Sequence, residues 1–111
     1  MESWEITKLE LDRHHPQVLA TDDEGRAIVL ELPAGERLGE HQVHERAWLV
    51  VISGAIEISE PGGATVAGGT GLLAIFDPNE RHQVAATEDA RLLLLLSPWP
   101  GEGHPSNHDA D

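Results

Sequence analysis

Two stretches of the chain carry side chains suited to holding a metal ion or moving a proton. His41, His44 and Glu45 lie close together in the first stretch, and His82 lies in the second. Imidazole nitrogens and carboxylate oxygens bind divalent metals, and histidine also changes its charge near neutral pH. The chain contains no cysteine, so any metal site must be built from His, Asp or Glu. Without a metal, two facing imidazoles could bind a carboxylate or act as acid and base.

The spacing of the first stretch leaves the third metal ligand open. On a regular strand His41, Val43 and Glu45 share one face and His44 points the other way. Glu45 would then join His41 and His82 in a set typical of Fe(II) or Mn(II). However, residues 41 and 45 lie about 13 Å apart when extended, so a bulge or turn is required. The same bend could turn His44 inward instead and give a three-histidine set that zinc accepts.

The acidic composition of the chain argues against two classes of binding partner. The chain has 20 acidic residues against 7 Lys and Arg, a net charge of −13. Nucleic acids and anionic membranes both require clustered cations, so we expect neither as a partner. The N-terminus shows no signal-peptide pattern, and the longest apolar run, Leu92–Leu96, is too short for a membrane helix. These features predict a cytoplasmic protein.

Short apolar or alternating runs separated by turn residues predict an all-β fold. A weak alternating pattern covers Ile6–Leu11, and the runs at Trp48–Ile52 and Leu72–Phe76 predict buried strands. The remaining predicted strands are Gln17–Thr21, Arg26–Leu32, Ala55–Glu60, Ala64–Ala67, Arg81–Thr87 and Ala90–Ser97. Their regular spacing is typical of a sandwich or barrel.

Two segments resemble the sequence motifs of the small cupins. In the first, Gly35, His41 and Gly54 match the glycine, histidine and glycine of the first cupin motif. In the second, Gly71 begins a strand that leads through a Pro-containing turn to His82, like the second motif. The resemblance implies a single-domain cupin jelly-roll β-barrel over residues 1–97, with its motif core at 26–97 and an irregular C-terminal tail at 98–111. Asn79 stands where the second motif commonly has glycine.

The resemblance leaves open whether this chain binds a metal ion. Metal-binding cupins use two His and a Glu from the first motif and the His of the second. Here Val43 and Ala47 occupy the positions of the second His and the Glu, and only His41 and His82 match. Other small cupins, mostly of unassigned activity, share this pattern. The resemblance also implies a homodimer and a ligand pocket at the barrel mouth, lined by His41, Val43, Ala47, Trp48, Phe76 and His82.

Three functions follow as hypotheses. The first is a cupin that binds a small molecule in the barrel mouth, with no catalytic residue assigned. The second is a metal-dependent oxygenase or isomerase acting on a small organic substrate. It would hold one divalent ion (Fe, Mn, Ni or Zn) through a set drawn from His41, His44, Glu45 and His82. The third is a barrel that serves only as a dimeric interaction module, whose interior is filled by its own side chains.

Overall fold

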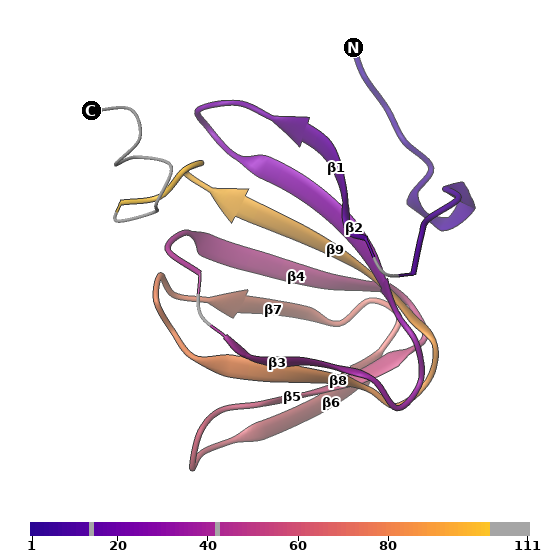
Figure 1. The fold of residues 1–111 in the computed structure, drawn as a ribbon, viewed down its shortest axis with the longest axis vertical. Coiled ribbons are helices and arrows are strands. Elements are labelled where there is room, and N and C mark those ends of the chain that lie inside the picture. The colour runs from indigo at the N-terminus through magenta and orange to yellow at the C-terminus, as the bar shows by residue number, and fades with distance from the viewer. Residues whose placement is uncertain (14, 42, 103–111) are drawn as a thin grey trace.

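The chain folds into two antiparallel sheets (Figure 1). A computed structural model describes residues 1–13, 15–41 and 43–102, with the backbone alone for residues 39–41. One sheet has the spatial order β1 (Gln17–Thr21), β2 (Arg26–Leu32), β9 (Ala90–Ser97), β4 (Arg46–Ser53) and β7 (Leu73–Phe76). The other has the order β3 (Arg37–His41), β8 (His82–Ala86), β5 (Ala55–Ser59) and β6 (Thr65–Gly69). The expected all-β jelly-roll architecture is confirmed, with two open sheets instead of one closed ring among the described residues.

The core lies between the two sheets and is built by alternation along the strands. In β4, for example, Ala47, Leu49 and Val51 are buried while the residues between them are partly exposed. Successive strand side chains point to opposite faces, so one residue in two faces the other sheet. The buried core cluster consists of Leu30, Leu32, Ala47, Leu49, Val51, Ile56, Ile58, Phe76, Val84, Ala86, Ala90, Leu92 and Leu96. Each large member contributes roughly 1.5–3 kcal/mol through burial.

Two turns explain residues that the motif pattern marked. Gly54 joins β4 to β5 with φ +82°, and a Cβ there would lie 2.0 Å from the carbonyl oxygen of Asp89. Only glycine therefore lets this turn approach the turn before β9. Asn79, in the turn between β7 and β8, has φ +66°. Asparagine tolerates this left-handed conformation, so the turn keeps its shape without the expected glycine.

Two strand predictions need correction. The segment Ile6–Leu11 is not a strand, because a single 3-10 turn, η1 (Ile6–Lys8), occupies its first half. The prediction that Leu72–Phe76 is buried is wrong for one face. Leu73 and Ile75 of β7 are 54% and 51% exposed, whereas Phe76 is buried. β7 is the edge strand of the first sheet, and its outward side chains are left largely open to solvent.

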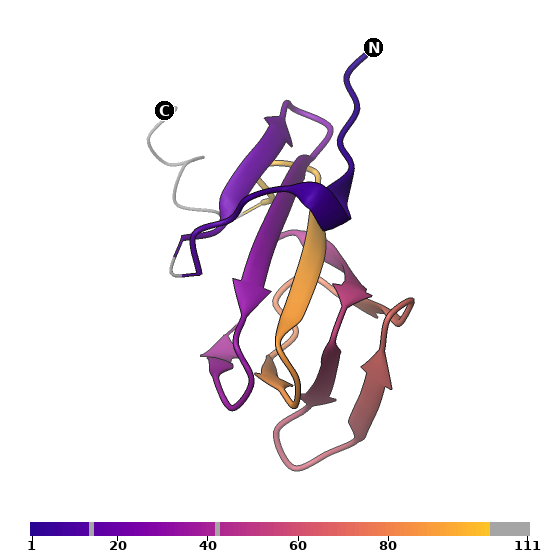
Figure 2. The same cartoon turned by 90° about the vertical axis from the view of Figure 1, so that its right-hand side faces the viewer.

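The N-terminal segment crosses the first sheet on its outer face (Figure 2). Arg91 of β9 donates a hydrogen bond from Nη1 to the carbonyl oxygen of Ile6 in η1, at 2.8 Å. Val29 alternates with the core residues of β2 and is nevertheless fully buried. One end of the outer face is thus covered. The described residues include no helix long and apolar enough to cross a membrane.

Candidate functional site

A small cavity lies between the sheets, near the ends of β3, β7 and β8. Its volume is about 30 Å³, room for roughly one or two water molecules. The lining is apolar except for one histidine and consists of Leu30, Leu38, Val43, Ala47, Leu49, Phe76, His82, Val84 and Leu94. The chain therefore fills most of its interior and leaves a narrow space beside His82.

His82 is the polar group of this cavity. It begins β8, is 4% exposed, and stacks on the Phe76 ring with centroids 3.7 Å apart and planes 5° from parallel. Its Nδ1 lies 3.3 Å from the carbonyl oxygen of Glu80. A carbonyl only accepts, so this contact favours a proton on Nδ1, which in the neutral ring makes Nε2 the acceptor. The stacking and the hydrogen bond together fix the orientation of the imidazole.

The first motif stretch bends where a regular strand would have continued. β3 ends at His41, β4 begins at Arg46, and residues 43–45 between them belong to no strand. The carbonyl oxygen of Val43 accepts a hydrogen bond from the amide of Asn79 at 2.7 Å, which ties this bend to the β7–β8 turn. In the backbone register His41 is paired with His82. The side chain of His41 lies outside what the structure describes.

Glu45 is 1% exposed, and its partner comes from the C-terminal end of the described chain. The backbone N–H of Gly101 donates to Glu45 Oε2 at 2.7 Å. A Cβ on residue 101 would lie 2.6 Å from the carbonyl oxygen of His44, so only glycine fits this close approach. Trp99 packs against the core, with the Arg26 guanidinium 3.9 Å above its ring. Residues 99–101 therefore pack against the barrel, while residues 103–111 of the expected tail lie outside the described chain.

The described side chains do not fit a metal ion. Among them, no three His, Asp or Glu residues gather closely enough to hold one. Glu45 Oε2 is occupied by the Gly101 amide, and His82 Nδ1 contacts the Glu80 carbonyl. His44 is half-buried in the bend, and His41 falls outside this test because its side chain is not described.

The structure separates the residues expected to line a ligand pocket. Val43, Ala47, Phe76 and His82 meet at the interior cavity. Trp48 points to the opposite side of its sheet, where it lines an open groove of about 500 Å³. The lining of this outer groove is Ala20, Asp22, Glu24, Gly25, Arg26, Ala27, Trp48, Leu95, Leu96 and Ser97. Neighbouring residues of a strand point to opposite faces, so Trp48 and Ala47 cannot both face the interior. Strand alternation in the sequence could have excluded Trp48 from the interior pocket.

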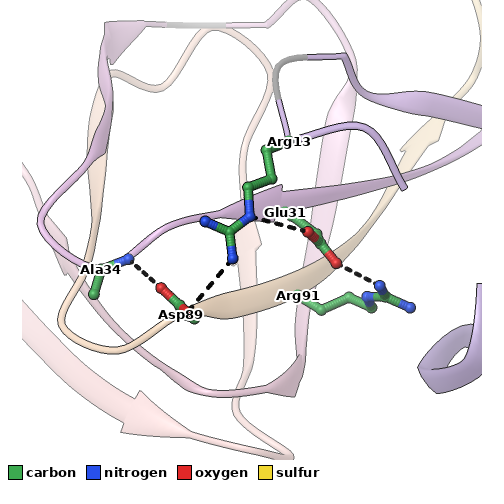
Figure 3. Close-up of polar contacts among 5 residues, drawn as sticks. All are labelled: Arg13, Glu31, Ala34, Asp89 and Arg91. Atoms are coloured by element: carbon green, nitrogen blue, oxygen red, sulfur yellow. Dashed lines mark hydrogen bonds and ion pairs between the residues drawn. The ribbon is translucent and has the colours of Figure 1, made fainter. Parts of the chain in front are cut away.

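A polar cluster at the other end of the barrel was missed by the sequence reasoning (Figure 3). Arg91 of β9 pairs with Glu31 of β2, and its side chain is only 12% exposed. Arg13 lies 4.0 Å from Glu31 and 3.8 Å from Asp89, which also accepts the amide N–H of Ala34 at 2.8 Å. These groups border a polar cavity of about 290 Å³. Since Arg91 also holds Ile6, the cluster fastens the N-terminal segment to the first sheet.

Comparison with known proteins places the chain in a family. The model of the Cupin domain family matches residues 28–98, and the chain belongs to this family, as its motifs predicted. None of the curated proteins compared with the chain matches it.

Solved structures agree with the fold. An RmlC-like cupin from Desulfovibrio desulfuricans aligns with a TM-score of 0.77 and 19% identity, covering 88% of this chain and 97% of that one. A protein with a double-stranded β-helix domain from Klebsiella pneumoniae aligns with a TM-score of 0.77 and 18% identity, covering 91% and 93%. A cupin-2 domain protein from Shewanella frigidimarina aligns with a TM-score of 0.69 and 13% identity, covering 82% and 87%. At these identities the likeness shows the fold alone.

Proposed function

We propose that this cupin binds a small, mostly apolar molecule that places one hydrogen-bonding group against His82. The observation that carries the proposal is a buried imidazole, fixed by Phe76 and Glu80, in a cavity whose other lining side chains are apolar. An apolar pocket with one oriented polar group is the usual design of a small-molecule site. A carboxylate or a hydroxyl can pair with the ring in either of its charge states.

The small volume of the cavity means that a ligand can bind only if lining side chains move. A space of about 30 Å³ holds water but not an organic molecule, so binding must displace lining side chains. The Val43 side chain would be the one displaced, because Val43 lies in the bend between β3 and β4 and not within a strand, while its carbonyl stays bonded to the Asn79 amide. The ligand would therefore enter through the end of the barrel where this bend lies.

A thermal-shift screen tests the proposal. Butanoate, benzoate and the corresponding alcohols are added to the wild type and to His82→Leu, and each shift is taken from that protein's own unliganded Tm. We expect a concentration-dependent rise in Tm for wild type, because a ligand that binds only the folded state stabilises it. The rise should be absent in His82→Leu and kept in His15→Ala, whose histidine is exposed. Equal shifts in wild type and His82→Leu would contradict the proposal.

We also propose that the working unit is a homodimer. Support comes from half-exposed apolar residues on the outer face of the first sheet, including Leu73, Ile75 and Leu95. Exposed apolar residues that cluster on one face are typical of protein–protein contact sites.

A further inference from the structure

A second cavity, called the edge cleft below, lies between the open edges of the two sheets. The first sheet ends at β7 and the second at β6, as the strand order in Figure 1 shows, and in the described chain no ladder joins these strands. The edge cleft has a volume of about 250 Å³ and is lined from both strands. Of its described lining residues, only Phe76 also lines the cavity beside His82. The two cavities are therefore distinct.

Val66 of β6 shows that the packing of the two sheets is incomplete at this edge. It is paired in register with Ile58 of β5, and directly opposed residues lie on the same face of a sheet. Ile58 is 5% exposed in the core, so Val66 also faces the first sheet, yet Val66 is 49% exposed. Two residues further along β6, Leu72 fills the space that a Cβ on Gly68 would take, with its Cδ2 only 2.8 Å away. No such filling covers Val66, which lines the edge cleft.

Two carboxylates lie at one end of the edge cleft. Glu60 directly follows β5 and Glu80 lies in the turn before β8, and both line the cleft. Because β5 and β8 are antiparallel neighbours, the end of β5 and the start of β8 lie at the same end of the sheet. Glu80 Oε1 accepts the amide N–H of Asp77 at 3.1 Å, but no ion pair among the described residues involves Glu60 or Glu80. None of the described lining residues is positively charged.

We propose that the edge cleft binds a small organic ammonium ion. The charged group would lie at Glu60 and Glu80, and the apolar part would lie between β6 and β7, against Val66. A protonated amine can only donate hydrogen bonds and an ionised carboxylate can only accept them, so the two are complementary. The net charge of −13 also attracts cations and disfavours anionic ligands.

The volume and lining of the edge cleft suit a small ligand. Typical small-molecule sites measure about 300–1,000 Å³ and are mostly apolar with a few polar groups that orient the ligand. The edge cleft, at about 250 Å³, lies just below this range, and its lining side chains are apolar except for the two carboxylates. A single ring or a short alkyl chain that carries one ammonium group matches this arrangement. The inference goes beyond the proposed binding at His82 and does not rest on it.

Isothermal titration calorimetry with benzylamine, which is protonated at neutral pH, tests the charged end of the cleft. We expect saturable binding of one equivalent to wild type. Binding to the double variant Glu60→Gln/Glu80→Gln should be at least about tenfold weaker, because charge-assisted hydrogen bonds are lost. Glu57→Gln is the matched control, since Glu57 is exposed on the opposite face of β5, and it should bind like wild type. Absence of saturable binding, or an equal loss in Glu57→Gln, would overturn the inference.

Two further titrations test the apolar part of the cleft. Methylammonium has the same charge without the ring, so it should bind wild type at least about tenfold more weakly than benzylamine. Equal affinities would reduce the effect to general attraction of cations by an acidic protein and would overturn the inference.

A variant that fills the cleft tests its position. Val66→Phe should abolish benzylamine binding, because the larger ring would occupy the space beside Val66. Thr65→Phe is the control, since Thr65 is the exposed neighbour that points to the other face of β6, and it should keep binding. Unchanged affinity in Val66→Phe would contradict the proposed position. If Val66→Phe does not fold, the wild-type comparison with methylammonium still decides.

These results can be separated from the screen with benzoate. His82 does not line the edge cleft, so His82→Leu should still bind benzylamine. Failure of benzylamine binding leaves the His82 proposal standing, and failure of the screen leaves the edge cleft standing.

Discussion

At the scale of single residues, the contact between Glu45 and Gly101 shows the limit of what the sequence could reveal. The resemblance to the cupin motifs pointed to His82, Val43, Ala47 and Phe76, and the structure places these four residues around one cavity. It could not find that the amide of Gly101 binds the buried Glu45 carboxylate, since the two residues are 56 positions apart. The sequence offered Glu45 as a candidate metal ligand, and the path of the C-terminal segment that brings the Gly101 amide to its Oε2 could not be predicted.

Gly101→Ala should measurably destabilise the protein. The added Cβ would lie 2.6 Å from the carbonyl oxygen of His44, so the segment must shift and weaken the hydrogen bond to buried Glu45. Leaving a buried polar group unsatisfied costs about 1–3 kcal/mol, which urea unfolding would detect. Gly63→Ala is the control, because a Cβ there makes only ordinary contacts at 3.4 Å. Equal stability of both variants would argue against the Glu45–Gly101 contact.

Metal content is the second prediction at this scale. Because the described side chains form no three-residue ligand set, we expect protein purified without chelators to hold substoichiometric metal. The amount measured by elemental analysis should be the same in His82→Ala. One equivalent of Fe, Mn, Ni or Zn that disappears in His82→Ala would instead support the metal-dependent hypothesis, with the undescribed His41 side chain completing the set.

At the scale of elements, strand positions were more predictable than the side of each strand that is covered. The predicted bounds of Gln17–Thr21, Arg26–Leu32 and Ala90–Ser97 agree with β1, β2 and β9. The apolar run at β7 indicated burial on both faces, but an apolar side chain may face either the core or a partner surface. The Ile6–Leu11 pattern failed for a related reason, since its alternation was too weak to distinguish a strand from a docked turn.

The docking of the N-terminal segment gives a prediction at this scale. Arg91 is largely buried and contacts both Glu31 and Ile6, whereas the Arg13 side chain is 59% exposed and lies 3.8–4.0 Å from its acidic partners. Arg91→Gln should therefore lower the free energy of unfolding by about 1–3 kcal/mol. Arg13→Gln should cost about 0–1 kcal/mol, as exposed ion pairs do. Urea unfolding measures the free energy of unfolding of both variants. A larger decrease for Arg13→Gln than for Arg91→Gln would contradict the role given to Arg91 in this cluster.

At the scale of the whole molecule, the fold uses its two kinds of apolar surface differently. The inner faces of both sheets fill the interior so completely that about 30 Å³ remains beside His82. The outer face of the first sheet keeps an apolar surface that a single copy does not cover. The hypothesis that the barrel serves only as an interaction module predicted such a filled interior. The proposed ligand binding rests instead on the orientation of His82 by Phe76 and Glu80.

The most direct test of the central claim is the NMR signal of the His82 ring nitrogens during titration with benzoate or another compound that raises Tm. The account predicts that the His82 Nδ1 and Nε2 signals shift with saturation, while those of exposed His15 do not. Signals of His82 that stay unchanged while the compound binds elsewhere would contradict it.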